Sequence, residues 1–272
     1  MVHQRRLRKM HGMRQLPRRL PGRCHTTGSQ RAVGRIVRKT IRVRQTIATI
    51  TTEDRFIAVA EREILRQRAK LEAYIRSDPR FGCSLEPCAV GRGAPEIARR
   101  MAEAAARVGV GPMAAVAGAI AEYAVRAMVE AGARHAIVDN GGDIALFLDR
   151  PVILALYTGR DGPLDLGLHL QPRSHLFGVC TSSATVGHSL SFGRADAATV
   201  IAGDIVLADA AATALGNRLT RPHAPTIRSA LNSLLLDGID CLIAVVGHRI
   251  GWCGDLPDVV RVDLPWHRIT KA

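Results

Sequence analysis

The stretch that most constrains this chain is residues 178–217, which joins a hydroxyl-rich loop, a short apolar run and an alanine-rich helix. The loop, residues 181–191, carries six Ser or Thr hydroxyls and one histidine, His188. Such a segment cannot fill a hydrophobic core, so we expect its hydroxyls and backbone N–H groups to face something polar. The helix places Asp209 and Thr213 four residues apart, on one face. The stretch therefore predicts a loop and a helix that together form an anion and metal site.

The size and composition of the chain favour a single domain with an aliphatic core. It has 272 residues, of which 47% are hydrophobic and only 4% aromatic, so it can bury a sizeable core that is rich in alanine. No internal repeat and no linker after residue 52 divide it. We therefore predict one domain over residues 35–272, preceded by a basic leader over residues 1–34.

The formal net charge of +14 is concentrated near the N-terminus. Fourteen Lys or Arg and no Asp or Glu lie in residues 1–52, which leaves 24 basic against 24 acidic residues in the remainder. A neutral body argues against nucleic-acid binding except through the leader. The leader itself allows three interpretations: an arm for nucleic acid or acidic membrane, a transit-like segment, or residues upstream of a true start at Met10 or Met13.

Targeting signals and cysteines point to a reducing compartment. The leader lacks the apolar core of a secretory signal, and no apolar run approaches the roughly 18 residues of a membrane span. The six cysteines form no Cys-x-x-Cys pair, which favours free thiols over structural zinc. We expect a cytoplasmic protein with no membrane span.

The hydrophobic pattern predicts an α+β fold. Helical periodicity indicates helices at residues 56–76, 95–107, 113–130, 204–219 and 225–235, and a loop at 80–93. Apolar or β-branched runs indicate strands at 35–52, 135–139, 144–148, 152–157, 164–170, 177–180, 195–202, 239–246 and 250–253. Strands in hairpin-like succession, with helices grouped before and after them, favour a mixed, mostly antiparallel sheet packed with helices. In the helix at 113–130, Glu122, Arg126 and Glu130 are expected to form an outward-facing charge ladder.

Two glycine motifs have both structural and functional interpretations. Gly109-x-Gly111-x-x-Ala114 matches the loose dinucleotide fingerprint, but a helix precedes it where the fingerprint needs a strand. A tight helix–helix turn fits better, and a middle interpretation brings backbone N–H groups and a helix N-terminus near a phosphate. Asn140-Gly141-Gly142-Asp143 is, taken alone, an ordinary hairpin turn. Its functional interpretation is that the glycines let a flat ligand touch the backbone.

The polar residues after residue 180 have alternatives of the same kind. Thr181, Ser182, Ser183 and His188 either cradle phosphate oxygens, with the imidazole moving a proton, or form a capped surface loop. No Gly-x-Ser-x-Gly motif accompanies them, which argues against a serine hydrolase. Asp209 and Thr213 offer the hard oxygen ligands that suit Mg²⁺. Their spacing alone nevertheless favours a solvent-facing stripe.

Three segments occur together in an order that resembles the ApbE superfamily, the FAD:protein FMN transferases. They are Ile-Val-Asp-Asn-Gly-Gly-Asp-Ile at 137–144, Cys-Thr-Ser-Ser at 180–183 and Ala-Asp-Ala-Ala-Ala-Thr-Ala at 208–214. The chain is more similar still to a group of uncharacterised ApbE-like proteins, through Val-Gly-Pro-Met-Ala-Ala-Val-Ala-Gly at 110–118 and the run after 180. The resemblance covers about residues 35–255.

This resemblance implies a flavin site with a metal ion. It implies that Asp209 and Thr213 are Mg²⁺ ligands and that His188 and Asp209 are the catalytic residues. It also implies a group that binds FAD, FMN or a related phosphorylated ligand: Gly111, Met113, Asn140, Gly141, Gly142, Asp143, Thr181, Ser182 and Ser183. The implied reaction is metal-assisted attack of a threonine of a protein substrate on the FMN phosphate, with AMP leaving. A homodimer is compatible with it.

Two departures from the transferase pattern imply an alternative. The transferases carry a Lys-Gly pair in the helix matched by residues 113–130, where this chain has no lysine. Their His-x-x-Asp-Pro-x-Thr-Gly segment is matched only by His188, followed by Ser-Leu-Ser-Phe-Gly. The alternative is a non-catalytic flavin or cofactor-binding protein on the same scaffold, with one-carbon cofactor metabolism as one setting.

Overall fold

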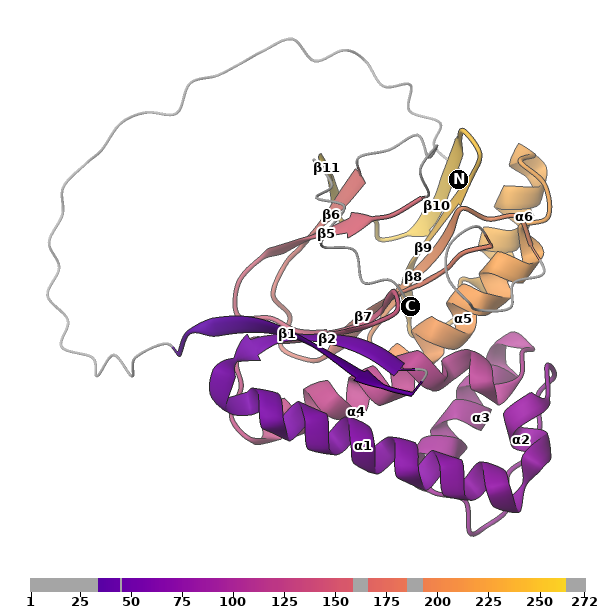
Figure 1. The fold of residues 1–272 in the computed structure, drawn as a ribbon. Helices are drawn as coiled ribbons and strands as arrows, with labels where there is room; N and C mark the ends of the chain where they lie inside the picture. The colour runs from indigo at the N-terminus through magenta and orange to yellow at the C-terminus, as the bar shows by residue number, and fades with distance from the viewer. Residues whose placement is uncertain (1–33, 45, 159–165, 185–192, 263–272) are drawn as a thin grey trace, which may run out of the picture.

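The computed structural model describes residues 34–44, 46–158, 166–184 and 193–262 (Figure 1). Most of the predicted basic leader and all of the loop segment around His188 lie outside these residues. The described part has the predicted α+β character, with two β-sheets and a set of helices.

Eight strands form one sheet in the order β1-β2-β3-β4-β7-β8-β9-β10, and every neighbouring pair is antiparallel. The strands are β1 (Ile36–Val43), β2 (Thr46–Glu53), β3 (Ala136–Asn140), β4 (Asp143–Phe147), β7 (Phe177–Ser182), β8 (Ala197–Ala202), β9 (Ile239–Val246) and β10 (Arg249–Gly254). The charged first strand, β1, lies at one edge. A charged edge strand is a common protection against edge-to-edge pairing.

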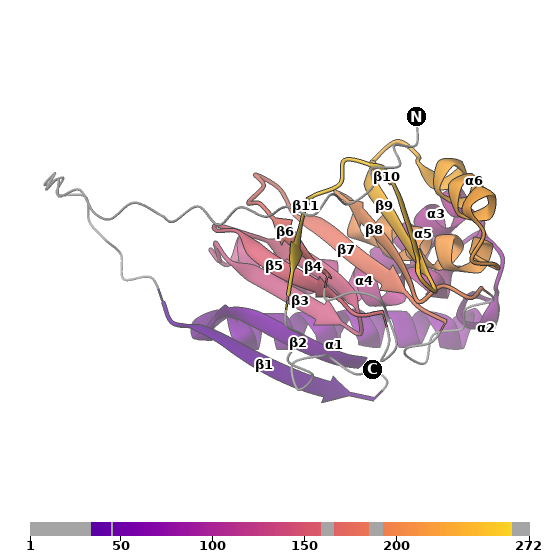
Figure 2. The same ribbon diagram turned by 90° about the horizontal axis from the view of Figure 1, so that it is seen from above.

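A smaller sheet of three strands, in the order β11-β6-β5, covers one face of the large sheet (Figure 2). Its strands are β5 (Val152–Leu156), β6 (Leu166–Leu170) and β11 (Asp258–Arg261). Leucines of β5 and β6 pack there against Phe177, Val179 and Ile201 of the large sheet. The last strand, β11, has no counterpart among the predicted elements. Because β7 pairs with β4 and β8, not with β6, the strands do not follow one another in a single meander.

Helices cover the opposite face of the large sheet (Figure 2). They are α1 (Asp54–Ser77), α2 (Pro79–Cys83), α3 (Glu96–Val108), the 3₁₀ turn η1 (Pro112–Ala115), α4 (Val116–Glu130), α5 (Ile205–Arg218) and α6 (Ala224–Leu234). Helix α4 packs on β3 and β4, α5 packs on β7 and β8, and α1 packs on α4. The two helices that cover the middle of the sheet therefore lie side by side.

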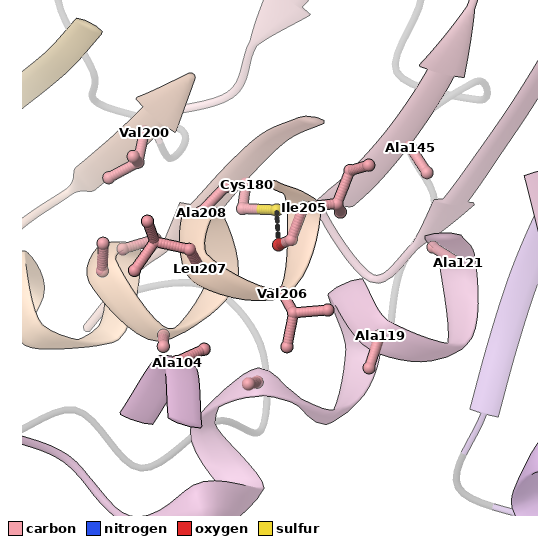
Figure 3. Packing of buried hydrophobic residues seen from close by; sticks show 14 of the residues in the cluster. Ala104, Ala119, Ala121, Ala145, Cys180, Val200, Ile205, Val206, Leu207 and Ala208 are labelled. Carbon is pink, nitrogen blue, oxygen red and sulfur yellow. Dashed lines mark hydrogen bonds between the residues drawn. The ribbon is translucent and has the colours of Figure 1, made fainter. Parts of the chain in front are cut away.

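Small side chains let α5 approach its neighbours closely. Eleven residues of α5 are buried, and most of them are alanine, valine or leucine. Ala119 of α4 and Ala104 of α3 lie near Val206 and Leu207 of α5, and Cys180 of β7 lies over its first turn (Figure 3). The alanine-rich composition of this helix thus follows from packing on all sides.

Three local expectations are wrong. Residues 80–93 are not all loop, because Pro79 starts the short helix α2, a position where its missing N–H costs nothing. Thr181 and Ser182 belong to strand β7 and not to a loop, because their backbones pair with β8. Glu122 does not face solvent: it is buried, with 2% of its side chain exposed, and pairs with Arg100 and Arg126.

One helical stretch, Pro112–Glu130, corrects the expectation that no apolar run approaches the length of a membrane span, because it is long and apolar enough to cross a membrane by length and composition. It comprises η1 and α4, and 56% of its apolar window is buried inside the fold. Its buried side chains contact α1, α3, α5 and the large sheet. The apolar character of this stretch is accounted for by its place as a core helix.

Candidate functional site

The position of Asp209 is set by a well-capped helix. Asp204 is the N-cap of α5, and its Oδ1 accepts hydrogen bonds from the backbone N–H groups of Val206 at 3.0 Å and Leu207 at 3.2 Å. Such a cap satisfies two of the donors that a helix start leaves free. The helix then carries Asp209, which is only 6% exposed. The solvent-facing stripe that spacing alone favours is therefore wrong for Asp209.

Asp209 caps a second helix from the side. Its Oδ2 accepts a hydrogen bond from the backbone N–H of Gly118 at 2.7 Å, and the N–H of Ala117 bonds to the same carboxyl. Both N–H groups lie in the first turn of α4, whose own N-cap residue, Ala115, has no side chain that could serve. Glycine is needed at 118, because a Cβ there would lie 2.7 Å from the Cβ of Asp209.

The twin-glycine turn lies beside this helix start. Gly141 and Gly142 have φ values of 73° and 102°, and Asn140 pairs with Asp143 across the turn, as in the tight hairpin turns that glycine favours. The Nδ2 of Asn140 donates to the carbonyl of Ala117 at 3.1 Å. The same turn thus joins β3 to β4 and attaches to the first turn of α4.

Asp143 and Asp209 form a pair of neighbouring carboxyl groups. The pKa of Asp209 is raised to about 7 by burial, against the backbone hydrogen bonds from Gly118 and Ala117 and a hydrogen bond with the side chain of Asp143. Burial and then the charge of Asp209 raise the pKa of Asp143 well above its usual value. Two neighbouring buried carboxyl groups resist ionising together.

Strand β7 supplies the next group of polar atoms. Cys180 lies opposite Asp143 in the sheet, and its buried thiol donates to the carbonyl of Ile205 at 3.8 Å (Figure 3). The hydroxyls of Thr181 and Thr199 are 2.9 Å apart, and the N–H of Thr181 donates to the carbonyl of Gly142 at 3.2 Å. The hydroxyl of Ser182 is buried and has no hydrogen-bond partner within the described residues.

The remaining predicted site residues lie at or beyond the margin of this cluster. Gly111 is the residue before η1, and a Cβ there would lie 1.9 Å from the carbonyl of Ser84, so close packing by itself requires glycine. Met113 lies in η1, partly buried against the core. Thr213 is one turn beyond Asp209 on α5 and is partly exposed, and Ser183 directly follows β7. His188 lies outside the described residues.

The donor set suits a hard divalent cation. Mg²⁺ usually takes one or two protein carboxylates and completes its shell with water and substrate phosphates. Asp143 and Asp209 are such a pair, and burial raises the pKa of both carboxyl groups. Within the part of the chain that the structure describes, no group of three or more His, Cys, Asp or Glu residues could hold a metal. A cation here would therefore depend on oxygen atoms of its ligand.

Two groups that contact Asp143 or Asp209 are not among the site residues predicted from the sequence. They are the first turn of α4, through Ala117 and Gly118, and the thiol of Cys180. Gly118 is the last residue of the sequence motif at 110–118, and a glycine within a helix is compatible with a close approach of another helix. Nothing in the sequence indicates that the carboxylate filling that space would be Asp209.

Comparisons with known proteins concern the family and the fold of the chain. Residues 34–243 match the model of a family described as "AbpE bacteria". A UPF0280 protein of Methanocella arvoryzae is 46% identical over 239 residues, which cover 87% of this chain and 97% of that protein. A UPF0280 protein of Archaeoglobus fulgidus is 41% identical, covering 84% of this chain and 97% of that protein.

Among solved structures, the apo form of the Pseudomonas stutzeri flavinyl transferase ApbE is similar in fold. The TM-score is 0.53 at 13% sequence identity, and the match covers 80% of this chain and 94% of the transferase. At that identity the likeness concerns the fold, and it agrees with the predicted ApbE-like α+β architecture. The chemistry has to be argued from the residues themselves.

Proposed function

The chain belongs to the AbpE bacteria family, and from that premise we propose that it binds a flavin nucleotide or a similar phosphorylated ligand together with Mg²⁺. The ligand site consists of the Asp143–Asp209 pair, the Asn140–Asp143 turn, the start of α4 and the end of β7. The proposed activity is transfer of the FMN group from FAD to a threonine of a protein substrate, in the cytoplasm.

One observation carries the proposal: two neighbouring carboxyl groups, one of them buried, lie where a helix start and a glycine turn meet. For stability alone, a carboxyl pair with raised pKa values is a cost. A cation removes that cost, and the ligand phosphates that complete its shell are drawn to backbone N–H groups. The arrangement therefore fits a phosphate-bearing ligand better than an uncharged one.

Each group of the chain has a distinct task in this proposal. Mg²⁺, when bound, would neutralise phosphate charge and polarise the phosphoryl oxygen. Asp209 and Asp143 would hold it, with Thr213 as a further oxygen donor. Gly141 and Gly142 lack side chains, so a ligand can approach the backbone closely. Hydroxyls of residues 181–183 would donate to ligand oxygens, and His188 would move a proton from the acceptor hydroxyl.

The test is whether FAD binds to the purified full chain in a Mg²⁺-dependent way. Binding is monitored by the quenching of flavin fluorescence, and AMP release is measured separately. We expect Asp209→Asn, which keeps the shape of the side chain and removes its charge, to weaken binding by about 100-fold. The matched control is Asp149→Asn, because Asp149 lies beyond the other end of β4 and pairs with His135. Binding of FAD that is equally tight in Asp209→Asn and in excess chelator would refute the proposal.

A second candidate function is a non-catalytic flavin or cofactor carrier. One observation favours it: Pro112–Glu130 contains no lysine, whereas the resemblance to the transferases calls for a Lys-Gly pair there. The carrier predicts that FAD binds but that no AMP appears over hours with Mg²⁺ and an acceptor peptide containing threonine. Release of AMP that stops in Asp209→Asn would decide for an enzyme, a transferase if the peptide gains FMN and a phosphoester-cleaving enzyme if free FMN appears.

A further inference from the structure

Glu122 is a charged residue in the core, and Arg100 is its main partner. Only 2% of the Glu122 side chain is exposed. Arg100, from α3, donates two hydrogen bonds to it, from Nη1 to Oε1 at 2.6 Å and from Nη2 to Oε2 at 3.0 Å. Such two-point pairing fixes the angle between the guanidinium and the carboxylate as well as their distance. The Arg100 side chain is therefore held rigidly on α4.

The same guanidinium reaches a third helix. Its Nη2 also donates to Oδ1 of Asp204 at 3.2 Å, the oxygen that caps the start of α5. A cation at the N-terminus of a helix is normally unfavourable, because the helix dipole is positive there. Burial also opposes the charge of Arg100, yet the hydrogen bond and charge of Glu122 and the charge of Asp204 raise its pKa overall. The arginine is thus retained in this place by its two carboxylate partners.

These bonds give α4 and α5 two points of attachment. One is the hydrogen bond from Gly118 to Asp209. The other is the bridge Glu122–Arg100–Asp204. Glu122 is one turn after Gly118 on α4, and Asp204 precedes Asp209 by five residues on α5. Two polar contacts at separate places along the packed helices oppose both sliding and rotation, whereas one opposes them less.

We propose that Arg100 is a positioning residue, which fixes α5 against α4 so that Asp209 stays on the N–H groups of Ala117 and Gly118 and beside Asp143. Its effect on ligand binding rests on the proposed function of that site. Its effect on the Asp209 contact does not, because that contact exists in the protein without ligand. The two consequences can be measured separately.

Arg126 provides a matched control. It pairs with the same carboxylate, from Nη2 to Oε1 of Glu122 at 2.6 Å, but it comes from α4 itself, and within the described residues it makes no hydrogen bond or ion pair to α5. Arg100→Gln and Arg126→Gln each remove one positive charge from Glu122. Only Arg100→Gln removes the bridge to Asp204. A purely structural role for the charge cluster predicts similar effects of the two changes.

The first measurement is amide hydrogen exchange in the protein without ligand, read at Ala117 and Gly118. In Arg100→Gln we expect exchange there to become about tenfold faster relative to the amides of β2, which report global unfolding. In Arg126→Gln we expect less than about a twofold change by the same measure. Arg100→Lys serves where Arg100→Gln folds poorly, because lysine keeps the charge but cannot make the two-point bond. Equal exchange in the Arg100 and Arg126 variants would overturn the proposal.

The second measurement is the affinity for FAD with Mg²⁺, well below the unfolding temperature. We expect about a tenfold loss in Arg100→Gln and a smaller loss in Asp204→Asn, which keeps a good helix cap. The double variant should bind no worse than Arg100→Gln, because both act through one bridge. Losses that simply add would contradict the bridge. If the unaltered protein binds no FAD, the proposed function fails, while the exchange measurement still decides the role of Arg100.

Discussion

At the scale of single residues, Gly118 decides how closely the two site helices approach. A Cβ at this position would lie 2.7 Å from the Cβ of Asp209 and 2.9 Å from the carbonyl oxygen of Ile205. The second contact is with backbone, which cannot rotate away as a side chain can. The absence of one methyl group therefore lets the carboxylate of Asp209 reach the N–H groups of α4.

We predict that Gly118→Ala lowers the free energy of unfolding by about 1–3 kcal/mol. An alanine would otherwise be favoured in a helix by about 1 kcal/mol, so the sign of the change separates crowding from helix propensity. The measurement is urea unfolding, and the control is Gly93→Ala, since a Cβ at residue 93 would meet open space. We expect that control to change stability by less than about 0.5 kcal/mol. A stabilised Gly118→Ala variant would show that α4 and α5 can move apart freely.

At the scale of elements, the Asp143–Asp209 pair joins α5 to the β3–β4 hairpin through groups whose ionisation is unfavourable. The pKa of Asp209 is about 7 in the folded protein and about 4 in an unfolded chain. Between about pH 4 and about pH 7 the folded state binds more protons than the unfolded state, so the stability of the folded state falls as the pH rises. The stabilising contribution is complete below about pH 4 and is lost by the time the pH passes about 7.

The difference in stability between the unaltered protein and Asp209→Asn should therefore depend on pH. We predict that the unaltered protein loses on the order of 2 kcal/mol relative to the variant between pH 4 and pH 8, without divalent cations. At pH 8, millimolar Mg²⁺ should restore part of the loss in the unaltered protein and none in the variant. Thermal unfolding at several pH values measures both. A difference that stays constant over this range would mean that the carboxyl group is solvated and unpaired.

The elements themselves could largely be predicted from sequence, because their signals are local. The amphipathic pattern of α1, the alanine run of α5 and the Asn-Gly-Gly turn each determine a local structure. Glu122 shows where local signals fail. Its spacing with Arg126 is that of an exposed ladder, and only the position of α3, with Arg100, makes it a core residue. The pairing of Asp209 with Asp143 also depends on tertiary structure, because 66 positions separate the two in sequence.

Strand β7 illustrates the same limit from the side of hydrogen bonding. Thr181 and Ser182 have the composition of a loop, yet they pair with Thr199 and Ala198 of β8. Hydroxyl-bearing residues occur in both states, because threonine is enriched in strands and serine is common in turns. The neighbouring strand decides between them. No single segment of the sequence indicates the site. Only the resemblance to the ApbE superfamily indicates that these segments belong together.

At the scale of the whole molecule, the basic N-terminal region consists of residues 1–33 and the strand β1 that follows them. Part of its charge lies at β1: Lys39 of this strand pairs with Glu61 at 2.7 Å, and Arg44, directly after the strand, pairs with Glu72 at 2.9 Å. These pairs attach the edge strand to α1. The family match begins at residue 34, two residues before the start of β1. We therefore propose that the domain starts close to residue 34 and that β1 belongs to it.

Deletion separates these two parts. We predict that a chain starting at Gly34 unfolds within about 2 °C of the full chain and binds FAD with the same affinity. A chain starting at Thr46 lacks β1 and leaves β2, with its buried Ile50, as an unprotected edge, so it should unfold at least about 5 °C lower and aggregate. Any salt-sensitive binding of DNA by the full chain should disappear with residues 1–33, because the nine basic residues there have no acidic neighbours in sequence. DNA binding that persists in the chain starting at Gly34 would instead place a nucleic-acid surface on the domain itself.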